Sequence, residues 1–384
     1  MKVCDVVLNS VWYDPRVKKQ IEEYIKHGVD LSVVGLSDNR INQEEISKIQ
    51  CDVNIVDVDP KYYREGRTIF TILKREWLIN TRVQTAIEAT RPDVIHANDL
   101  NALIPAYYAA KKLKCGLIYD SHEIWLENFT LGKVVKAFFS YYERKIVKKL
   151  DLFISVSNAA ADYFANKYKI SRPMVITNCV KKVSDESIAV EKYTGFEVLN
   201  HGQFYKGRGY DTMLKAAQLC STPDITFVIR GRGSMEKELN DYLAFHHVSN
   251  ARIDPPVRVE ELIPMAARAH VGVVITEPIC LSFRLTVSNK IFEYAAAGLP
   301  IIMSDVPEHR YLNEKYHIGI ILKDNSPKCL YEAVKSLYEN KNFYCECSQN
   351  ALRMADELNW ENEFSKVIDF ENQYCNKMKD GDCR

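Results

Sequence analysis

Residues 286–302 read TVSNKIFEYAAAGLPII, a helix with recognisable ends that leads into an apolar strand. Ser288 or Asn289 is a suitable N-cap, because a short polar side chain can accept a hydrogen bond from the first free N–H groups. The helix is predicted to run to Ala297, and Gly298 provides the backbone freedom that ends it. A helix followed at once by a buried strand is the repeating unit of a parallel α/β sheet.

The same alternation extends along the chain in both directions. Short apolar strands separated by segments of helical period predict doubly wound α/β folds, because strands covered on both faces are apolar throughout. The first set of predicted strands covers 3–9, 31–36, 53–58, 94–97, 117–120, 152–156 and 174–178. The second set covers 197–200, 225–229, 251–253, 271–275, 300–303 and 318–322.

Two sets of strands predict two domains. The polar stretch 181–194 has few large apolar residues and is interpreted as the linker. We therefore expect an N-terminal Rossmann-like domain at 1–180 and a C-terminal one at 195–359. The last segment, 360–384, is predicted to hold a helix that packs back toward the first domain. Ligands bind beyond the carboxyl ends of such strands, so the site is expected in a central cleft that the two domains face.

The composition excludes several classes of protein. Hydrophobic residues make up 47% of the 384 residues, charged residues 27%, and the formal net charge is zero, so no overall field favours nucleic acid. No apolar run is long enough to span a membrane, and Asp5 interrupts the apolar core that a signal peptide needs. The 11 cysteines are scattered without zinc-site spacing. We expect reduced thiols, no metal, no bound cofactor and a cytoplasmic location.

The start of the 286–302 helix suits an anionic ligand. Free backbone N–H groups at Ser288 and Asn289, together with the helix dipole, favour a diphosphate, and Lys290 adds a full positive charge. Glu293 lies on the same face by helical spacing, where its carboxylate can accept the two hydroxyls of a ribose. The alternative interpretation is a well-capped buried helix whose lysine and glutamate face solvent.

Two loops that follow predicted strands contain glycines and cations. In LNHGQFYKGRGYD, Gly202 ends a strand, and the loop after it carries Lys206 and Arg208, which suit a phosphate. A basic surface loop is the alternative. In FVIRGRG, Arg230 precedes a G-x-G pattern that begins at Gly231, but the third glycine of the dinucleotide fingerprint is missing. This argues against a nicotinamide cofactor.

Ionisable side chains also gather at strand ends in the first half of the chain. The stretches IHANDL and IYDSHEIW follow neighbouring predicted strands and contribute His96, Asp99, Asp120, His122 and Glu123. Such a cluster indicates a functional site, although each histidine alone could be a hydrogen-bonded structural residue.

The loop after the first strand ends in a helix start. Asp14 can cap this helix, with Pro15 at its first position, which explains both residues structurally. Arg16 is then expected to be free to reach the cleft.

Farther along, 131–150 carries six Lys or Arg residues, one Glu and an apolar stripe. This pattern predicts contact with a membrane surface, so a peripheral position on the inner face is expected; an ordinary helix packed on the sheet is the alternative.

Taken together in their order, these motifs resemble the family-4 GT-B glycosyltransferases. The donor-site helix of that family is similar to SNKIFEYAAAGLP, and its other motifs are similar to NHGQFYKGRGYD, DPRV, PDVIHAND, YDSHE, DLFISVSNAAADYF and VITN. The resemblance covers nearly the whole chain. It implies a retaining transfer from a nucleoside diphosphate sugar, UDP by default, without a catalytic metal. The acceptor implied is a glycan or a lipid-linked molecule, in surface polysaccharide or glycoconjugate synthesis.

The resemblance also implies roles for single residues. Catalytic contributions are expected from His122, Arg208 and Lys290. Donor binding is expected from Gly202, Lys206, Arg230, Gly231, Ser288, Asn289 and Glu293. Acceptor binding is expected from Asp14, Arg16, Asp99 and Glu123. The cations and the helix dipole would stabilise the departing diphosphate, while the acceptor hydroxyl attacks on the same face of the sugar.

Two positions depart from the family pattern. Leu285 stands where a Glu often lies eight residues before the ribose-binding Glu, and Gln203 stands where an Arg often follows the glycine. These departures keep a non-catalytic GT-B partner subunit open as an alternative. A nucleotide-sugar epimerase, which needs no acceptor, is the other alternative.

Overall fold

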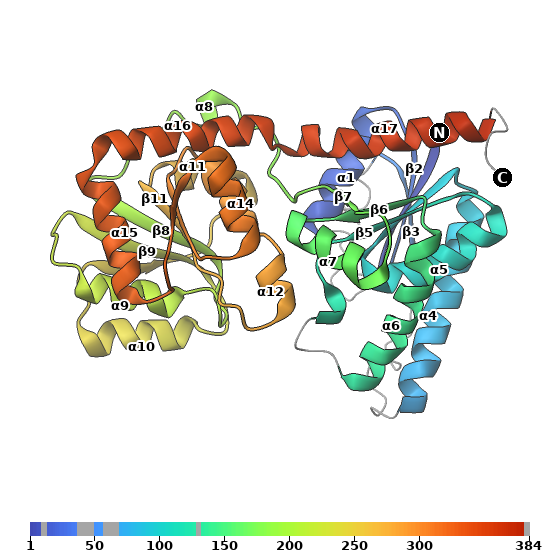
Figure 1. Cartoon of the computed structure of the whole chain (residues 1–384), viewed down its shortest axis with the longest axis horizontal. Helices are drawn as coiled ribbons and strands as arrows, with labels where there is room; N and C mark the ends of the chain where they lie inside the picture. Colours follow the sequence, from blue (N-terminus) through green and yellow to red (C-terminus); the bar gives the residue numbers. More distant parts are fainter. Residues whose placement is uncertain (9–13, 37–49, 57–68, 128–131, 380–384) are drawn as a thin grey trace. The chain divides into compact units, whose positions relative to one another are not determined.

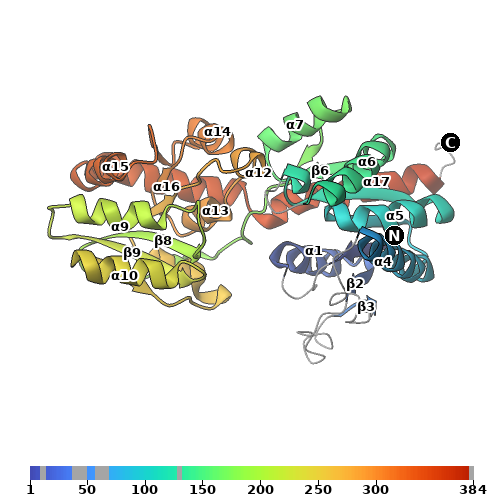
Figure 2. The ribbon, with the colours of Figure 1, turned by 90° about the horizontal axis from the view of Figure 1, so that it is seen from below.

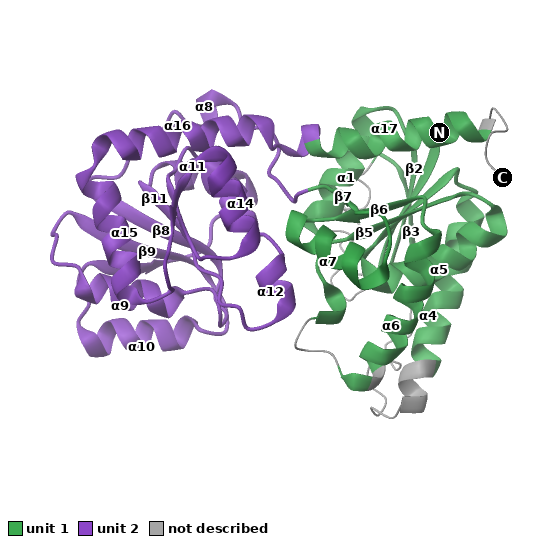
Figure 3. Ribbon diagram, viewed as in Figure 1, with its two compact units in different colours: residues 1–176, 363–384 green, residues 177–362 purple. Residues whose placement is uncertain are grey.

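A computed structural model of the chain describes residues 1–8, 14–36, 50–56, 69–127 and 132–379. These residues form two compact units (Figure 3). Unit 1 comprises Met1–Ile176 and Glu363–Arg384, and unit 2 comprises Thr177–Asn362. Figures 1 and 2 show that each unit consists of a sheet with flanking helices.

Unit 1 contains a seven-stranded parallel sheet in the order β3-β2-β1-β4-β5-β6-β7. The strands are β1 (Lys2–Val7), β2 (Asp30–Leu36), β3 (Asp52–Val56), β4 (Val94–Asn98), β5 (Gly116–Ser121), β6 (Leu152–Ser155) and β7 (Met174–Val175). The helices are α1 (Pro15–Lys26), α4 (Ile69–Thr90), α5 (Asp99–Leu113), η2 (Trp125–Glu127), α6 (Lys133–Ile146), η3 (Val147–Lys149), α7 (Asn158–Tyr168) and most of α17 (Trp360–Lys379).

Unit 2 contains a six-stranded parallel sheet in the order β10-β9-β8-β11-β12-β13. Its strands are β8 (Phe196–Gln203), β9 (Ile225–Arg232), β10 (Ala251–Asp254), β11 (Val271–Val274), β12 (Ile301–Met303) and β13 (Gly319–Ile321). Its helices are α8 (Asp185–Ile188), α9 (Tyr210–Leu219), α10 (Glu236–His246), η4 (Val259–Glu261), α11 (Leu262–Ala267), α12 (Leu281–Leu285), α13 (Asn289–Ala296), α14 (Pro307–Tyr316), α15 (Pro327–Glu339) and α16 (Lys341–Glu357). The predicted α/β class with two Rossmann-like domains is therefore present.

Strand order explains where ligands of each sheet can bind. In both sheets the first strand of the unit lies inside the sheet, and the chain runs outward on either side of it. In doubly wound sheets a ligand crevice lies at the carboxyl edge where the strand order reverses, which is between β1 and β4 in one sheet and between β8 and β11 in the other. The predicted site residues cluster around these two crevices.

The ends of α13 agree with the sequence prediction except at one residue. Ser288 is the N-cap by its backbone, but its side chain makes no capping hydrogen bond within the described residues. The helix ends at Ala296, with Ala297 as its C-cap, one residue earlier than predicted. Gly298 adopts φ 66° and donates its N–H to the Ala295 carbonyl at 3.0 Å. The left-handed conformation of Gly298 thus ends the helix before the strand begins.

The segment predicted as a linker lies within unit 2. It contains the short helix α8, and Lys192 Nζ donates to the Ala269 carbonyl at 2.7 Å. Tyr193 N–H donates to the Arg268 carbonyl at 2.8 Å. These bonds connect Lys192 and Tyr193 to the residues directly after α11, within unit 2.

Candidate active site

The loop after β8 is held close to the neighbouring strand. Gly207 and Gly209 adopt φ 85° and 70°, and Glu277 N–H donates to the Gly207 carbonyl at 2.9 Å. A Cβ added at Gly209 would lie 2.3 Å from Ile275 Cβ. Only glycine allows this approach, because any side chain would both clash and require a strained backbone. The two glycines therefore fix the path of the loop that carries Lys206 and Arg208.

Lys290 is buried at the first turn of α13. Its Nζ donates to Asn200 Oδ1 at 2.8 Å and lies 5.4 Å from the centre of the Tyr210 ring. Asn200 Nδ2 in turn donates to the Arg208 carbonyl at 3.2 Å, so one amide connects the helix start to the loop. Burial, reinforced by the nearby Arg208 charge and opposed by Glu293, lowers the pKa of Lys290 to about 7.

Arg208 is held by aromatic rings. Its guanidinium carbon lies 5.0 Å from the centre of the Tyr205 ring and 4.7 Å from that of Phe283. Its Nε is buried, and the described residues offer it no hydrogen-bond partner. Cation–π contacts stabilise a charge without using its N–H donors, so these donors remain available to an anion. Lys206 in the same loop is exposed.

Glu293 lies one turn after Lys290, as its spacing predicts. Its Oε2 lies 2.7 Å from His201 Nε2, and its side chain retains 19% of its accessible surface. His201 is buried, and its backbone N–H donates to the Tyr294 hydroxyl at 2.9 Å. His201 thus orients the carboxylate while leaving part of it open to a ligand.

Gly202 and Gly231 allow the ends of β8 and β9 to lie close together. They adopt φ 128° and 149°, and a Cβ on Gly231 would lie 1.9 Å from the Gly202 carbonyl oxygen. Beside them, Arg230 is buried and pairs with Asp254 at 3.2 Å, with a second bond to the Met265 carbonyl at 3.4 Å. Its guanidinium is therefore occupied by protein groups in this state. Its predicted contact with a nucleoside stays a prediction.

Unit 1 brings a second set of predicted residues together at the ends of β4 and β5. Asp120 accepts two hydrogen bonds from Arg16, at 2.9 and 3.0 Å, and one from Gln20 at 2.8 Å. Arg16 also donates to the Ile176 carbonyl at 3.1 Å and is only 2% exposed. The expectation that Arg16 is free to reach the cleft is therefore wrong: its bidentate partner comes from a distant strand. Its predicted contact with an acceptor remains untested.

His122 lies between several carboxylates. Its Nε2 lies 3.0 Å from Asn98 Oδ1, and its Nδ1 lies 3.5 Å from Asp99 Oδ2 and 3.6 Å from Asp14 Oδ2. Burial alone would lower the pKa of His122, but the charges of Asp99, Asp120 and Asp14 outweigh it and raise the pKa to about 9. His122 is therefore a cation at neutral pH.

The remaining predicted residues complete this set. Asp14 caps α1, accepting from the backbone N–H groups of Arg16 and Val17 at 3.0 and 3.2 Å, as predicted. Asp99 has the left-handed φ of 63°, which turns the chain sharply from β4 into α5, and accepts from His122 N–H at 3.0 Å. Burial raises the pKa of Asp99 to about 6, against the opposing charge of His122. Glu123 is half-buried.

The structure adds residues that were not predicted as part of the site. Asn200 and His201 contact Lys290 and Glu293, and Gln20 and Asn98 contact Asp120 and His122. His201 and Asn200 sit at the end of β8 directly before Gly202, so their place at a strand end was a usable signal. Gln20 gives no such signal, because it lies inside a helix.

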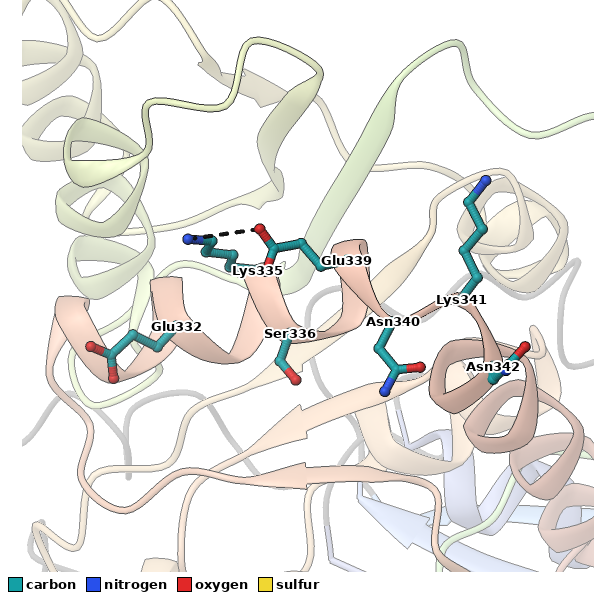
Figure 4. A pocket seen from close by; sticks show the side chains of 7 residues that line it. All are labelled: Glu332, Lys335, Ser336, Glu339, Asn340, Lys341 and Asn342. Atoms are coloured by element: carbon teal, nitrogen blue, oxygen red, sulfur yellow. Dashed lines mark ion pairs between the residues drawn. The ribbon is translucent and has the colours of Figure 1, made fainter.

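Other features of the described residues lie away from these clusters. The pocket in Figure 4 lies where α15 meets α16, where Lys335 and Glu339 form a 3.7 Å ion pair, and no predicted site residue lines it. Within the described ranges, no three or more His, Cys, Asp or Glu side chains are grouped to hold a metal ion. No described helix is long and apolar enough to cross a bilayer.

Two family models match successive parts of the chain. The model of Glycosyltransferase Family 4 matches residues 16–182, and that of Glycosyl transferases group 1 matches residues 195–340. The chain belongs to the family-4 GT-B glycosyltransferases. No curated protein sequence matches this glycosyltransferase at a significant level.

Solved structures show the same fold at low sequence identity. A glycosyltransferase from Rickettsia africae ESF-5 aligns with a TM-score of 0.74 and 13% identity, over 97% of this chain and 98% of that one. Anabaena HepE in complex with UDP aligns with a TM-score of 0.75 and 15% identity, over 97% and 100% of the two chains. A Staphylococcus aureus TarM variant in complex with fondaparinux, alpha-GlcNAc-glycerol and UDP aligns with a TM-score of 0.71 and 9% identity, over 97% and 99%.

Proposed function

We propose that this glycosyltransferase transfers a sugar, with retention of configuration and without a catalytic metal, from a nucleoside diphosphate sugar to a hydroxyl of a glycan or a lipid-linked acceptor. A UDP-sugar is the favoured donor, and surface polysaccharide or glycoconjugate synthesis is the favoured setting. The observation that carries the proposal is the pair of cations formed by buried Lys290 at the start of α13 and half-buried Arg208 in the loop after β8, whose Nε has no hydrogen-bond partner among the described residues.

The chemistry follows from the charge that develops during transfer. As the sugar–phosphate bond breaks, the diphosphate gains negative charge, and Lys290, Arg208 and the N-terminus of α13 would stabilise it. Glu293, oriented by His201, would hold the ribose hydroxyls. A phosphate oxygen of the leaving group would accept the proton of the attacking hydroxyl, which puts the incoming and leaving oxygens on one face of the sugar.

The solved relatives support the choice of donor. HepE and the TarM variant are in complex with UDP, and TarM is also in complex with alpha-GlcNAc-glycerol. These proteins share the fold at 9 to 15% identity, and the nucleotide and acceptor proposed for this chain follow by analogy with them.

The donor site is tested by thermal unfolding with UDP, GDP, ADP and CMP. A ligand present at about 100 times its Kd adds roughly 2.7 kcal/mol to the stability of the folded state. We expect one diphosphate to stabilise the wild type and to stabilise Glu293→Ala much less. If none of the four stabilises the wild type, the donor-site assignment is wrong.

A non-catalytic partner subunit remains the second candidate because Leu285 stands where the family often has a glutamate. Such a subunit would bind the nucleotide without turning it over. Release of nucleoside diphosphate from the matching sugar nucleotide, measured with and without a pool of candidate acceptors, separates the two. Acceptor-dependent release supports the transferase.

Contact with a membrane surface is proposed through one face of α6. Phe139 and Ile146 of the predicted apolar stripe are buried within unit 1, which leaves Tyr141, 63% exposed, beside exposed Arg144 and Lys145. This face suits anionic headgroups rather than deep insertion. Flotation with vesicles containing phosphatidylserine, compared with neutral vesicles at rising salt, tests it: salt-sensitive binding to the anionic vesicles alone is expected.

A further inference from the structure

A buried chain of polar side chains connects the C-terminal helix to Asp120 in unit 1. The Tyr24 hydroxyl on α1 donates to Glu371 Oε1 on α17 at 2.7 Å and lies 2.9 Å from His96 Nδ1 on β4. On the far side of the imidazole, His96 Nε2 lies 3.6 Å from Asp120 Oδ2. All four side chains are completely buried. Glu371 and Asp120, the first and last members of this series of side chains, lie far apart in the sequence.

The positions of the hydroxyl and imidazole hydrogens in this series of side chains can be assigned from the donors and acceptors present. Tyr24 has one hydroxyl hydrogen, and it goes to the Glu371 carboxylate, so the Tyr24 oxygen accepts from His96 Nδ1–H. His96 Nε2 faces the Asp120 carboxylate, which favours a second hydrogen there. With both imidazole nitrogens protonated, the ring is a cation that faces the Asp120 carboxylate on one side, at ion-pair rather than hydrogen-bond distance, and Tyr24 on the other.

The surrounding charges agree with a cationic His96. Burial opposes the charge, but Asp120, Asp5 on β1 and Glu371 together raise the pKa of His96. Burial raises the pKa of Glu371 to about 7, while His96 and the Tyr24 hydrogen bond oppose that rise. Phe364 of α17 stacks on the imidazole with ring centres 6.3 Å apart and excludes water from it. A buried imidazolium needs such counter-charges to persist.

We propose that Glu371 is a positioning residue for the candidate site: through Tyr24 it keeps His96 cationic, and His96 fixes the Asp120 carboxylate that holds Arg16. The inference rests on the proposed function for the use of the site, but the charge coupling itself is independent of that function. Without the Glu371 charge, the proton affinity of His96 falls, because one of the charges that raise its pKa is removed. Asp120 then faces a neutral imidazole more often, and its bonds to Arg16 weaken.

Nuclear magnetic resonance of the full chain, labelled in histidine and arginine, tests this coupling. The variants are Glu371→Gln, which keeps the volume but removes the charge, and Tyr24→Phe, which removes the bridging hydroxyl but keeps both charges. Asp369→Asn is the matched control, because it removes an exposed charge from the same helix. His96 and Arg16 signals are assigned by their loss in His96→Gln and Arg16→Gln.

In Glu371→Gln we expect the proton affinity of His96 to fall at least tenfold and hydrogen exchange at Arg16 Nε–H to become at least tenfold faster. Tyr24→Phe should also speed that exchange, and Asp369→Asn should match the wild type. If a folded Glu371→Gln protein keeps the wild-type titration of His96 and the wild-type exchange at Arg16, the proposal is wrong. No ligand or turnover enters these measurements, so they fail or succeed independently of the donor-binding tests.

Discussion

Donor binding should take up a proton at Lys290. The amine is 8% exposed, and its pKa is lowered from 10.5 to about 7 by burial and by Arg208. A bound diphosphate supplies the missing counter-charge and raises this pKa again. Because the bound form needs the ammonium, affinity is greatest below pH 7 and falls as the pH rises above it. For a pKa of about 7, the Kd should weaken roughly fivefold from pH 7 to 8 and by close to tenfold over the next unit.

Titration calorimetry with UDP-glucose is the assay, since its diphosphate does not itself titrate in this range. In buffers of different ionisation enthalpy, binding should take up about half a proton at pH 7 and about nine-tenths at pH 8. Lys290→Met should bind more weakly at pH 7 and lose the pH dependence. Lys237→Met, which changes an exposed lysine on α10, should behave as the wild type. Binding to the wild type without proton uptake at pH 8, or an unchanged pH slope in Lys290→Met, would refute the reasoning.

Three further predictions concern the packing around the two clusters. Gly209→Ala should destabilise unit 2 by roughly 1–3 kcal/mol, measured by urea unfolding, because the new methyl overlaps a buried side chain and the backbone φ is positive. Asp120→Asn should lower the free energy of unfolding in urea by roughly 3–5 kcal/mol, because Arg16 stays buried without its counter-charge. An unchanged free energy of unfolding would show that the pair is not buried in solution. His201→Ala should weaken UDP binding by roughly tenfold, because Glu293 loses the bond that orients it, and should also lower the melting temperature, because a buried side chain is removed; equal affinity would remove His201 from the donor site.

Much of the donor-side arrangement was predictable because it is local. Lys290 and Glu293 face the same way by helical spacing alone, and Gly298 ends their helix through its own φ. The glycines at 207 and 209 predict a tight loop, because glycine can adopt a positive φ. What spacing could not give was the state of Lys290: its low pKa depends on how deeply tertiary packing buries it.

Arg16 shows where local reasoning failed. Asp14 and Pro15 explain the start of α1, and the side chain that follows was expected to be free. Its partner, Asp120, lies 104 residues later, on strand β5. No periodicity encodes that pairing, because it depends on which strands the crossovers place side by side in the sheet.

The sequence by itself determined the elements of this glycosyltransferase, the family to which it belongs and the strand ends and helix starts that carry its polar residues. The elements follow from backbone preferences and from the periodicity of apolar residues over a few positions, whereas the family follows from the resemblance of the motifs in their order. Only the tertiary structure decided the partners: Lys290 with Asn200, Glu293 with His201, Arg16 with Asp120, and Tyr24 with Glu371. Charge states and hydrogen bonds depend on distance in space and on burial, and both arise only when the sheets assemble.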